Sequence, residues 1–211
     1  MNYGEAPEVV GEFVTPDCDM MFVLYLPFWI EGVGFNLPSH LSGYDDFVNQ
    51  CWSLESKRRK WKYAYLTVKC LFVEKGCLGG RLGWHTDGFG TDDVNYIWSD
   101  SDPTEFCVQP FALSNDHELS MIEMKQQARP ENIVDYGACN VVRIDARHVH
   151  RCPENPRAGY RTFARVSFSN NKYDLIGNAH NHDLDYNWIM HPRGVVRNDT
   201  ATPAQQDRSL S

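Results

Sequence analysis

The chain has 211 residues, of which 42% are hydrophobic and 13% aromatic, which is enough for one sizeable core in an all-β barrel or sandwich. Its formal net charge of −8 at pH 7 argues against broad binding to a polyanion such as nucleic acid. No apolar run approaches the length of a membrane-spanning helix, which argues against an integral membrane protein.

The cysteines indicate a reducing compartment. All seven are scattered along the chain, and no Cys-x-x-Cys pair occurs. Neither a disulfide framework nor a thiolate zinc site is therefore predicted. The first residues, Met-Asn-Tyr-Gly-Glu, lack the basic and then apolar pattern of a secretion signal. We expect reduced thiols and a soluble, cytoplasmic protein.

The first part of the chain predicts two strands and a helix. Residues 20–30 are apolar and aromatic, and Pro27 within them indicates an edge position or a bulge. Residues 42–45 resemble a capping box, and apolar residues follow at helical spacing, so a helix is predicted over residues 43–55. Residues 63–74 alternate as a long strand does, and glycines then turn the chain.

The rest of the chain predicts many short strands and few helices. This pattern favours a sandwich or barrel over alternating βαβ units. We expect one domain over residues 1–193 and a disordered, polar tail over residues 194–211. The predicted strands are 94–98, 105–113, 140–145, 146–152 and 160–169, with a short helix at 119–127.

His85 and Asp87 stand one residue apart in the stretch Gly-Trp-His-Thr-Asp-Gly at positions 83–88. In an extended strand both side chains point to the same face. An imidazole nitrogen and a carboxylate presented together supply two of the three ligands of a 2-His-1-carboxylate iron site. Because His-x-Asp alone is a common pattern, a metal site requires a third ligand from elsewhere in the chain.

The segment Arg-His-Val-His-Arg at positions 147–151 can supply that third ligand. If the segment is extended, His148 and His150 share a face and both could point inward. Only one of them is needed to complete the ligand set.

A basic strand follows the two histidines. Residues 153–159 are short and full of helix and strand breakers, which predicts a hairpin. His150 would then lie almost opposite Arg161 on the returning strand. Arg161, Arg165 and Ser167 occupy alternate positions, so both arginines could face the same cavity as His150.

In the order of these residues the chain resembles the Fe(II)- and 2-oxoglutarate-dependent dioxygenase superfamily. The order is His85-x-Asp87, a distal His150, and Arg161 eleven residues later. The resemblance implies a mainly β fold, the double-stranded β-helix (a jelly-roll, cupin-like fold) with a few flanking helices. It also implies that His85, Asp87 and His150 hold Fe(II), and that Arg161 binds the far carboxylate of 2-oxoglutarate through its planar, permanently charged fork.

Two assignments within this scheme have alternatives. The spacing to Arg161 favours His150 over His148 as the distal ligand, which leaves His148 as a packed or supporting histidine. Arg165-Val166-Ser167 matches the Arg-x-Ser pattern with which some family members bind the cosubstrate, so Arg165 and Ser167 are also candidates for cosubstrate binding. If His148 were the ligand, Arg165 would become the natural partner of the far carboxylate.

The resemblance implies an enzyme with Fe(II) as its metal and with 2-oxoglutarate and O2 as cosubstrates. Oxidative decarboxylation of 2-oxoglutarate to succinate and CO2 would be coupled to hydroxylation, or a related C–H oxidation, of a substrate. Asp87 favours this over halogenation, since halogenating relatives carry a small residue there. The acidic balance and small size favour a small organic substrate, with a nucleobase or nucleic acid as an alternative. Two further alternatives are a non-catalytic cupin-like metal- or ligand-binding protein and an iron oxygenase that needs no 2-oxoglutarate.

Aromatic and histidine residues outside this set have two interpretations each. Trp84, Tyr96, Trp98 and Phe106 lie near the metal-binding segments and could line an apolar substrate pocket or be plain core. The sequence His-Asn-His-Asp at 180–183 is metal-capable, but its flanks favour a polar loop over the barrel mouth.

Overall fold

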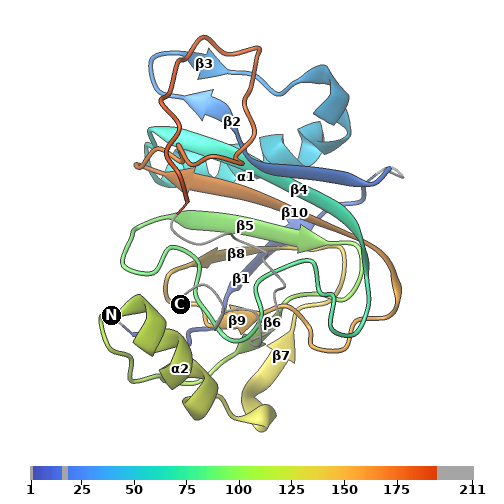
Figure 1. Ribbon diagram of the computed structural model, residues 1–211, viewed down its shortest axis with the longest axis vertical. Coiled ribbons are helices and arrows are strands. Elements are labelled where there is room, and N and C mark those ends of the chain that lie inside the picture. The colour runs from blue at the N-terminus through green and yellow to red at the C-terminus, as the bar shows by residue number, and fades with distance from the viewer. Residues whose placement is uncertain (1, 16–18, 194–211) are drawn as a thin grey trace, which may run out of the picture.

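The computed structural model describes residues 2–15 and 19–193, so the tail predicted over residues 194–211 lies outside the described residues. Figure 1 shows strands occupying most of the molecule, with helices beside them. In chain order the elements are β1 (Glu8–Glu12), β2 (Met21–Ile30), β3 (Gly34–Phe35), η1 (Ser39–Tyr44), α1 (Asp45–Arg58), β4 (Tyr63–Val73), β5 (Val94–Ser99), β6 (Glu105–Cys107), α2 (His117–Gln127), η2 (Pro130–Asn132), β7 (Ile133–Asp135), β8 (Asn140–Asp145), β9 (His150–Arg151) and β10 (Gly159–Ser169).

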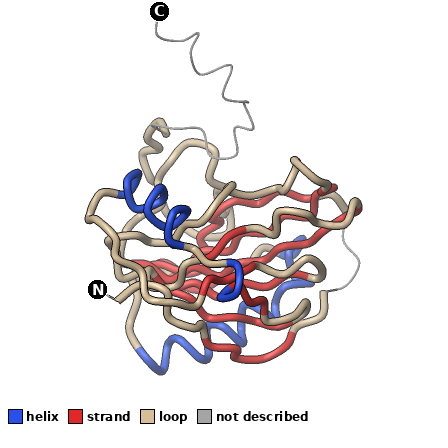
Figure 2. The backbone as a smooth tube through the Cα atoms, turned by 90° about the horizontal axis from the view of Figure 1, so that it is seen from below, coloured by secondary structure: helices blue, strands red, loops and turns tan. Residues whose placement is uncertain are grey.

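The strands form a large and a small antiparallel sheet. The large sheet has the order β1-β8-β5-β10-β4-β2-β3, and the small one the order β7-β6-β9. From β5 onward the chain passes from the large sheet to the small one and back twice, and apolar side chains of both sheets share one core cluster. This is the arrangement of a jelly roll, so the predicted mainly β, double-stranded β-helix with a few flanking helices is confirmed. The helices lie at the periphery of the strands (Figure 2).

Strand β10 shows how the large sheet separates its two faces. Ala164, Val166 and Phe168 join the main core cluster, in which Phe47 and Val48 of α1 also pack. Because side chains alternate along a strand, the intervening Arg161, Phe163, Arg165 and Ser167 point to the opposite face, toward the small sheet. One face of the large sheet is therefore an apolar surface under α1, and the other carries cations.

The start of helix α1 differs from the prediction. A 3-10 turn, η1, occupies the predicted first turn, and α1 itself begins at Asp45. Its N-cap is Tyr44, which makes no side-chain capping hydrogen bond. The predicted capping box at residues 42–45 is therefore wrong, because Ser42 belongs to the 3-10 turn instead of the N-cap position.

Some strands are shorter than predicted, and one predicted pairing is wrong. The strand predicted over residues 105–113 extends only over β6, and that over 146–152 only over β9. β9 pairs with β6, whereas β10 pairs with β4 and β5, so the segment between β9 and β10 crosses between the sheets and is no hairpin. That segment contains two prolines, which cannot donate the ladder hydrogen bonds of a tight hairpin.

Two other expectations concern covalent links and membranes. The described cysteines are free thiols, in agreement with the predicted absence of a disulfide framework. Within the described residues, the helices are too short or too polar to cross a bilayer.

Candidate metal centre

His85 and His150 are held side by side by main-chain hydrogen bonds. The amide of His85 donates to the carbonyl of His150 at 3.0 Å, and the amide of His150 donates back to His85 at 2.9 Å. This antiparallel bridge joins the segment after β4 to strand β9. The two imidazole rings lie with their centroids 4.5 Å apart. Residues 65 positions apart in sequence are thus neighbours on one face.

Asp87 completes a group of three metal-capable side chains. One potential ligand atom from each of His85, Asp87 and His150 lies within 4.8 Å of the other two. Both histidines are buried and Asp87 is partly buried. Gly83 and Gly88 flank the motif with φ of +74° and +72°, a left-handed conformation that glycine adopts without strain. These glycines let the chain turn sharply into and out of the ligand segment.

The hydrogen bonds of the two imidazoles fix which nitrogen can bind a metal. Nδ1 of His85 lies 2.9 Å from the carbonyl oxygen of Gly83, and Nδ1 of His150 lies 2.9 Å from that of His148. A carbonyl only accepts, so each Nδ1 carries the proton and each Nε2 keeps a free lone pair. Burial, with the neighbouring His150, lowers the pKa of His85 to about 3, and burial also lowers the pKa of His150. Both rings are therefore neutral near pH 7, the form that ligates metals.

Arg165 of β10 forms an ion pair with the carboxylate of this group. Its Nη1 lies 2.7 Å from Oδ2 of Asp87. Burial raises the pKa of Asp87, but the charge and the hydrogen bond of Arg165 outweigh it and hold that pKa well below its usual range. The guanidinium also lies over the ring of Tyr25, with Cζ 4.7 Å from the ring centroid. Nε of Arg165 is buried without a hydrogen-bond partner in the described part of the molecule.

Tyr25 reaches Arg165 because strand β2 is irregular. The register between β2 and β4 shifts between Val23 and Leu26, and Tyr25 has a φ of +49° there. Its amide donates to Oγ1 of Thr67 at 3.0 Å instead of to a ladder carbonyl. The bulge predicted around Pro27 is thus present, and a second one re-aims the Tyr25 side chain toward the site. No local pattern around Tyr25 predicts this second bulge.

Arg161 lies four residues, about 13 Å, from Arg165 along the same face of β10. Its Nε donates to the carbonyls of Ser101 and Asp102 at 3.1 and 3.0 Å. Its Nη2 is buried without a partner among the described residues, and burial lowers its pKa. Ser167, the remaining candidate on this strand, donates its hydroxyl to Oδ1 of Asn95 at 2.6 Å. Arg161 therefore has free hydrogen-bonding capacity, whereas the Ser167 hydroxyl is already engaged.

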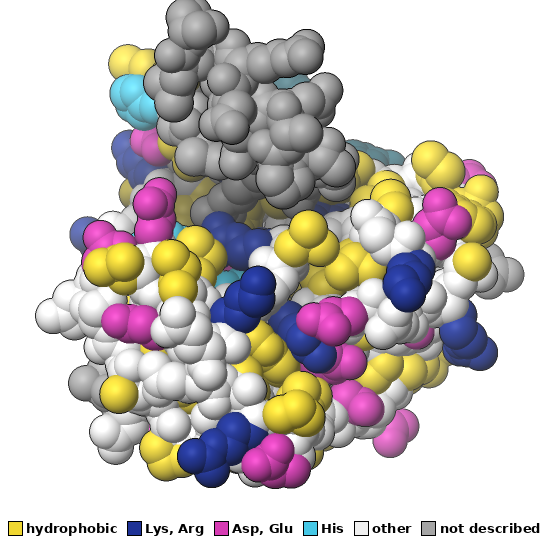
Figure 3. All heavy atoms as spheres, turned by 60° about the horizontal axis from the view of Figure 1, so that its bottom comes forward, with side chains coloured by type: hydrophobic (Ala, Val, Ile, Leu, Met, Phe, Trp, Pro, Cys, Tyr) yellow, Lys and Arg dark blue, Asp and Glu magenta, His cyan; other side chains and the backbone are white. Residues whose placement is uncertain are grey.

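Basic side chains are also prominent on the outside of this region. In Figure 3, which brings the lower part of Figure 1 forward, Lys and Arg side chains gather near the middle of the visible face. Histidine side chains are visible close to them. Asp and Glu side chains lie among them, so this face carries both charges.

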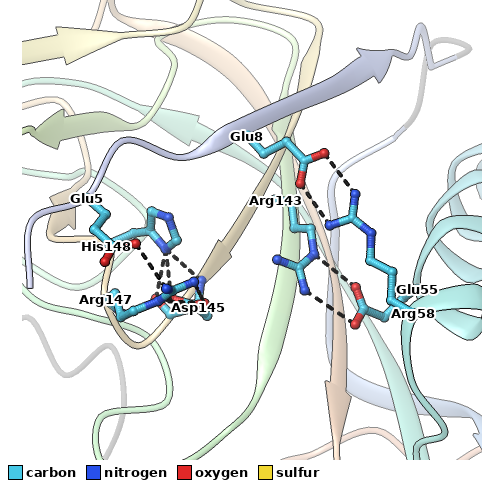
Figure 4. A network of polar contacts seen from close by, with 8 residues as sticks. All are labelled: Glu5, Glu8, Glu55, Arg58, Arg143, Asp145, Arg147 and His148. Carbon is cyan, nitrogen blue, oxygen red and sulfur yellow. Dashed lines mark hydrogen bonds and ion pairs between the residues drawn. The ribbon is translucent and has the colours of Figure 1, made fainter. Parts of the chain in front are cut away.

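His148 is held outside the ligand group. Residues 146–149 lie in the connection between β8 and β9, so the strand alternation that would align His148 with His150 does not apply. Nδ1 of His148 is 3.0 Å from Oδ1 of Asp145 and 2.9 Å from its amide nitrogen. In Figure 4 these two residues form a cluster with Arg147 and Glu5. His148 thus orients His150 through its carbonyl, while its ring contacts Asp145 at the end of β8.

This geometry predicts different effects for the two histidines. His150→Ala should weaken Co(II) binding by more than about a hundredfold, because it removes a ligand itself. His148→Ala should weaken it by no more than about tenfold, because the carbonyl that orients His150 remains. Titration of each variant with Co(II), followed by its visible absorption, measures both effects. A larger loss in His148→Ala than in His150→Ala would assign the distal ligand to His148.

The four aromatic residues do not line one pocket. Tyr96 and Trp98 belong to the core on the α1 side of the large sheet, away from the metal-capable group. Trp84 packs in a separate cluster and lies under the Arg151 guanidinium, 4.4 Å from the ring centroid. Phe106 alone contacts the site, with its ring centroid 5.8 Å from that of His150. For Tyr96 and Trp98 the structure favours the interpretation as plain core, because alternation along β5 directs them to the face under α1.

The C-terminal loop carries two further histidines. His180 and His182 are exposed and lie against each other at 4.6 Å between ring centroids, and the ring centroid of His180 also lies 4.6 Å from that of Tyr186.

Lys69 of β4 was not a candidate from the sequence. A lysine in the middle of the apolar run Tyr-Ala-Tyr-Leu-Thr-Val-Lys-Cys-Leu-Phe-Val is nevertheless a signal for a functional residue. The register of β4 against β10 places it on the face that carries Arg161 and Arg165.

Comparisons with solved structures give distant likenesses in fold. The chain is similar to a solved structure described as an oxidoreductase of the 2OG-Fe(II) oxygenase family from Burkholderia pseudomallei. The two share 12% sequence identity with a TM-score of 0.37, over 79% of this chain and 74% of that chain. No protein-family model matches the chain, and no curated protein matches it in sequence. What the centre can bind follows from its own residues.

Proposed function

We propose that this protein is an Fe(II)- and 2-oxoglutarate-dependent oxygenase. The observation that carries the proposal is the convergence of two neutral imidazoles and one carboxylate, with their ligand atoms within 4.8 Å, beside two arginines that each keep one buried nitrogen without a hydrogen-bond partner among the described residues. The coupled reaction would oxidise a C–H bond of a small organic substrate and release succinate and CO2.

The donor set fits Fe(II). Two imidazole nitrogens and one carboxylate oxygen on one side of the metal leave positions open for other ligands, as in non-haem iron oxygenases. The fixed Nδ1 protons of His85 and His150 direct both Nε2 lone pairs to the site. Arg165 keeps Asp87 ionised, so the carboxylate is ready to bind a cation. Arg165 bonds to Oδ2 of Asp87, so a metal would take the other carboxylate oxygen.

The buried cations fit 2-oxoglutarate. A guanidinium pairs bidentately with a carboxylate, and the buried Nη2 of Arg161 and Nε of Arg165 both lack partners among the described residues. Unpaired buried donors cost about 1–3 kcal/mol each, so their presence indicates a ligand that satisfies them. Arg161 would bind the far carboxylate of 2-oxoglutarate, and Arg165 would lie beside the metal, near the other end of that ligand. The hydroxyl of Ser167 is already bonded to Asn95 of β5, so Ser167 would hold β10 against its neighbouring strand.

The chemistry comes from the bound groups, and the protein contributes their placement. Fe(II) with 2-oxoglutarate and O2 supplies the oxidising power for hydroxylation of a C–H bond. His85, Asp87 and His150 hold the metal, while Arg161 and Arg165 orient the oxo acid and exclude water from its carboxylates. The carboxylate at position 87 favours hydroxylation over halogenation. A small organic molecule is the substrate class that the acidic balance and small size of the chain favour.

An anaerobic titration tests the proposal. With Fe(II) present, 2-oxoglutarate should produce the weak visible charge-transfer band of an iron-bound 2-oxo acid, and addition of air should release succinate. Arg161→Met should weaken 2-oxoglutarate binding by about tenfold to a hundredfold, because it removes a charged carboxylate partner.

Each alternative class gives a different result. Metal binding without a band and without succinate would indicate a non-catalytic, cupin-like metal-binding protein. Oxidation of a substrate that continues unchanged in Arg161→Met without 2-oxoglutarate would indicate an iron oxygenase that needs no oxo acid. Turnover of a nucleobase within the substrate panel would identify a nucleic acid or nucleoside substrate.

A further inference from the structure

Lys69 is a third cation on the face of the large sheet that carries Arg161 and Arg165. In the antiparallel pairing of β4 with β10, Lys69 lies directly opposite Phe163, Leu71 opposite Arg161, and Thr67 opposite Arg165. Residues opposite each other share a face, so Lys69 projects between the two arginines. The diagonal spacing in such a pair is about 7–8 Å, which brings its amine within reach of the same ligand as Arg161.

The partners of Lys69 leave its charge uncompensated. Within the described part of the chain, Nζ donates to the carbonyl of Gly79 at 3.2 Å, and its ammonium lies 5.4 Å from the centroid of the Phe22 ring. None of the ion pairs among the described residues includes Lys69. Burial, with the nearby Arg165, lowers its pKa to about 8. A carbonyl and a ring satisfy a donor, but they do not neutralise a buried ammonium.

Nearby acidic groups do not supply the missing charge. Asp87 is already paired with Arg165 at 2.7 Å. Burial raises the pKa of Cys152, the thiol near Lys69 and Arg161, so it is neutral near pH 7. Arg161 bonds only to main-chain carbonyls and has a buried, unpartnered Nη2. Asp100 and Asp102 act on Arg161, and Asp87 on Lys69, only from beyond ion-pair distance. Lys69 and Arg161 are therefore two adjacent, partly or fully buried cations that form no ion pair among the described residues.

We propose that Lys69 and Arg161 together bind the distal carboxylate of 2-oxoglutarate, and that Lys69 makes the site selective for dicarboxylic over monocarboxylic 2-oxo acids. This inference rests on the proposed function. The planar fork of Arg161 fixes the orientation of the carboxylate, and the ammonium of Lys69 adds a point charge from the adjacent strand. The bond from Lys69 to Gly79 tethers the amine to the glycine-rich segment that precedes His85.

Binding of two oxo acids of equal length tests the role of Lys69. The anaerobic charge-transfer band of the Fe(II) protein reports binding of 2-oxoglutarate and of 2-oxopentanoate, which lacks the distal carboxylate. Lys69→Met should weaken binding of 2-oxoglutarate by on the order of tenfold to a hundredfold and leave 2-oxopentanoate binding unchanged. Lys69→Arg should retain most of the discrimination. Lys62→Met, which changes an exposed lysine just before β4, should alter neither affinity.

A measurement on the unsubstituted protein avoids any dependence on folding of a variant. Reductive methylation followed by peptide mass spectrometry reports the reactivity of the Lys69 amine. Saturating 2-oxoglutarate should protect Lys69, whereas 2-oxopentanoate at equal occupancy should protect it much less. Lys62 should be methylated equally in all samples.

The outcomes separate this inference from the proposed function. If 2-oxoglutarate gives no band with the unsubstituted protein, both fail. If the band forms but Lys69→Met keeps full discrimination, or Lys69 is methylated equally with either acid, the role of Lys69 is overturned and the proposed function stands. If a folded Lys69→Met variant binds both oxo acids more weakly by the same factor, the role of Lys69 in selectivity is also overturned. Lys69 would then support the metal centre instead.

Discussion

Asp87→Ala should abolish metal binding at the centre and, with it, succinate release. The carboxylate is the one anionic ligand of the group, and its removal leaves two neutral imidazoles beside the unpaired Arg165 cation, which repels a divalent metal. Loss of a supporting hydrogen bond typically weakens metal affinity by about 10–100-fold, so loss of a charged ligand should exceed a hundredfold. Co(II) titration and Fe(II) retention after dialysis measure the effect.

The same substitution should also destabilise the fold, and a second variant separates the two effects. Removing one partner of a mostly buried ion pair costs about 3–5 kcal/mol, because the other charge stays buried without compensation. In Asp87→Ala/Arg165→Met that unpaired charge is gone, so much of the stability should return while the metal affinity stays low. Asp46→Ala, at an exposed position in the first turn of α1, is the matched control: it should leave metal affinity unchanged and cost no more than about 1 kcal/mol, the favourable interaction of a carboxylate with the helix dipole. Full metal affinity in the double variant would remove Asp87 from the ligand set.

The fold was predictable where a single strand or helix carries its own signal. The alternation over β10 separates an apolar face under α1 from a cationic face, and this alternation is visible in the sequence. The long strand β4 and helix α1 follow in the same way from periodicity. The short strands β1 and β7 have five and three residues, too few for a periodic signal, and their position depends on pairing with β8 and β6.

The candidate site was predictable in its composition and less so in its geometry. The order His85, Asp87, His150 and Arg161 identifies the group, and the structure brings the first three together. The ion pair of Asp87 with Arg165 and the contact of Tyr25 with Arg165 join segments far apart in sequence, so no local pattern predicts them. The predicted hairpin was wrong because turn-forming residues mark where a chain bends, but not which sheet the next strand joins.

An effect on stability of similar size should come from the other face of the large sheet, at Glu55. This glutamate of α1 is 1% exposed and accepts hydrogen bonds from Nε of Arg143 at 2.9 Å and from the hydroxyl of Tyr96 at 2.8 Å. Glu55→Ala leaves Arg143 without its partner and opens a cavity under α1, which should lower the free energy of unfolding by about 3–5 kcal/mol. Urea denaturation followed by circular dichroism measures this loss.

A surface pair beside it provides the control. Figure 4 shows Glu8 and Arg58 paired close to Glu55 and Arg143. The side chains of Arg58 and Glu8 are 40% and 50% exposed, so Glu8→Ala should cost no more than about 1 kcal/mol. Equal losses in Glu55→Ala and Glu8→Ala would show that the buried pair contributes no more than the exposed one.

The metal affinity of Glu55→Ala decides whether the two faces of the sheet act independently. Glu55 and Arg143 lie on the α1 side, whereas the ligand group lies toward the small sheet, so Co(II) affinity should stay unchanged while stability falls. Sites without shared partners usually combine additively, so Glu55→Ala and Asp87→Ala should add in stability within about 0.5 kcal/mol. A coupling larger than this would mean that the packing of α1 against β10 sets the position of Arg165, and through it that of Asp87.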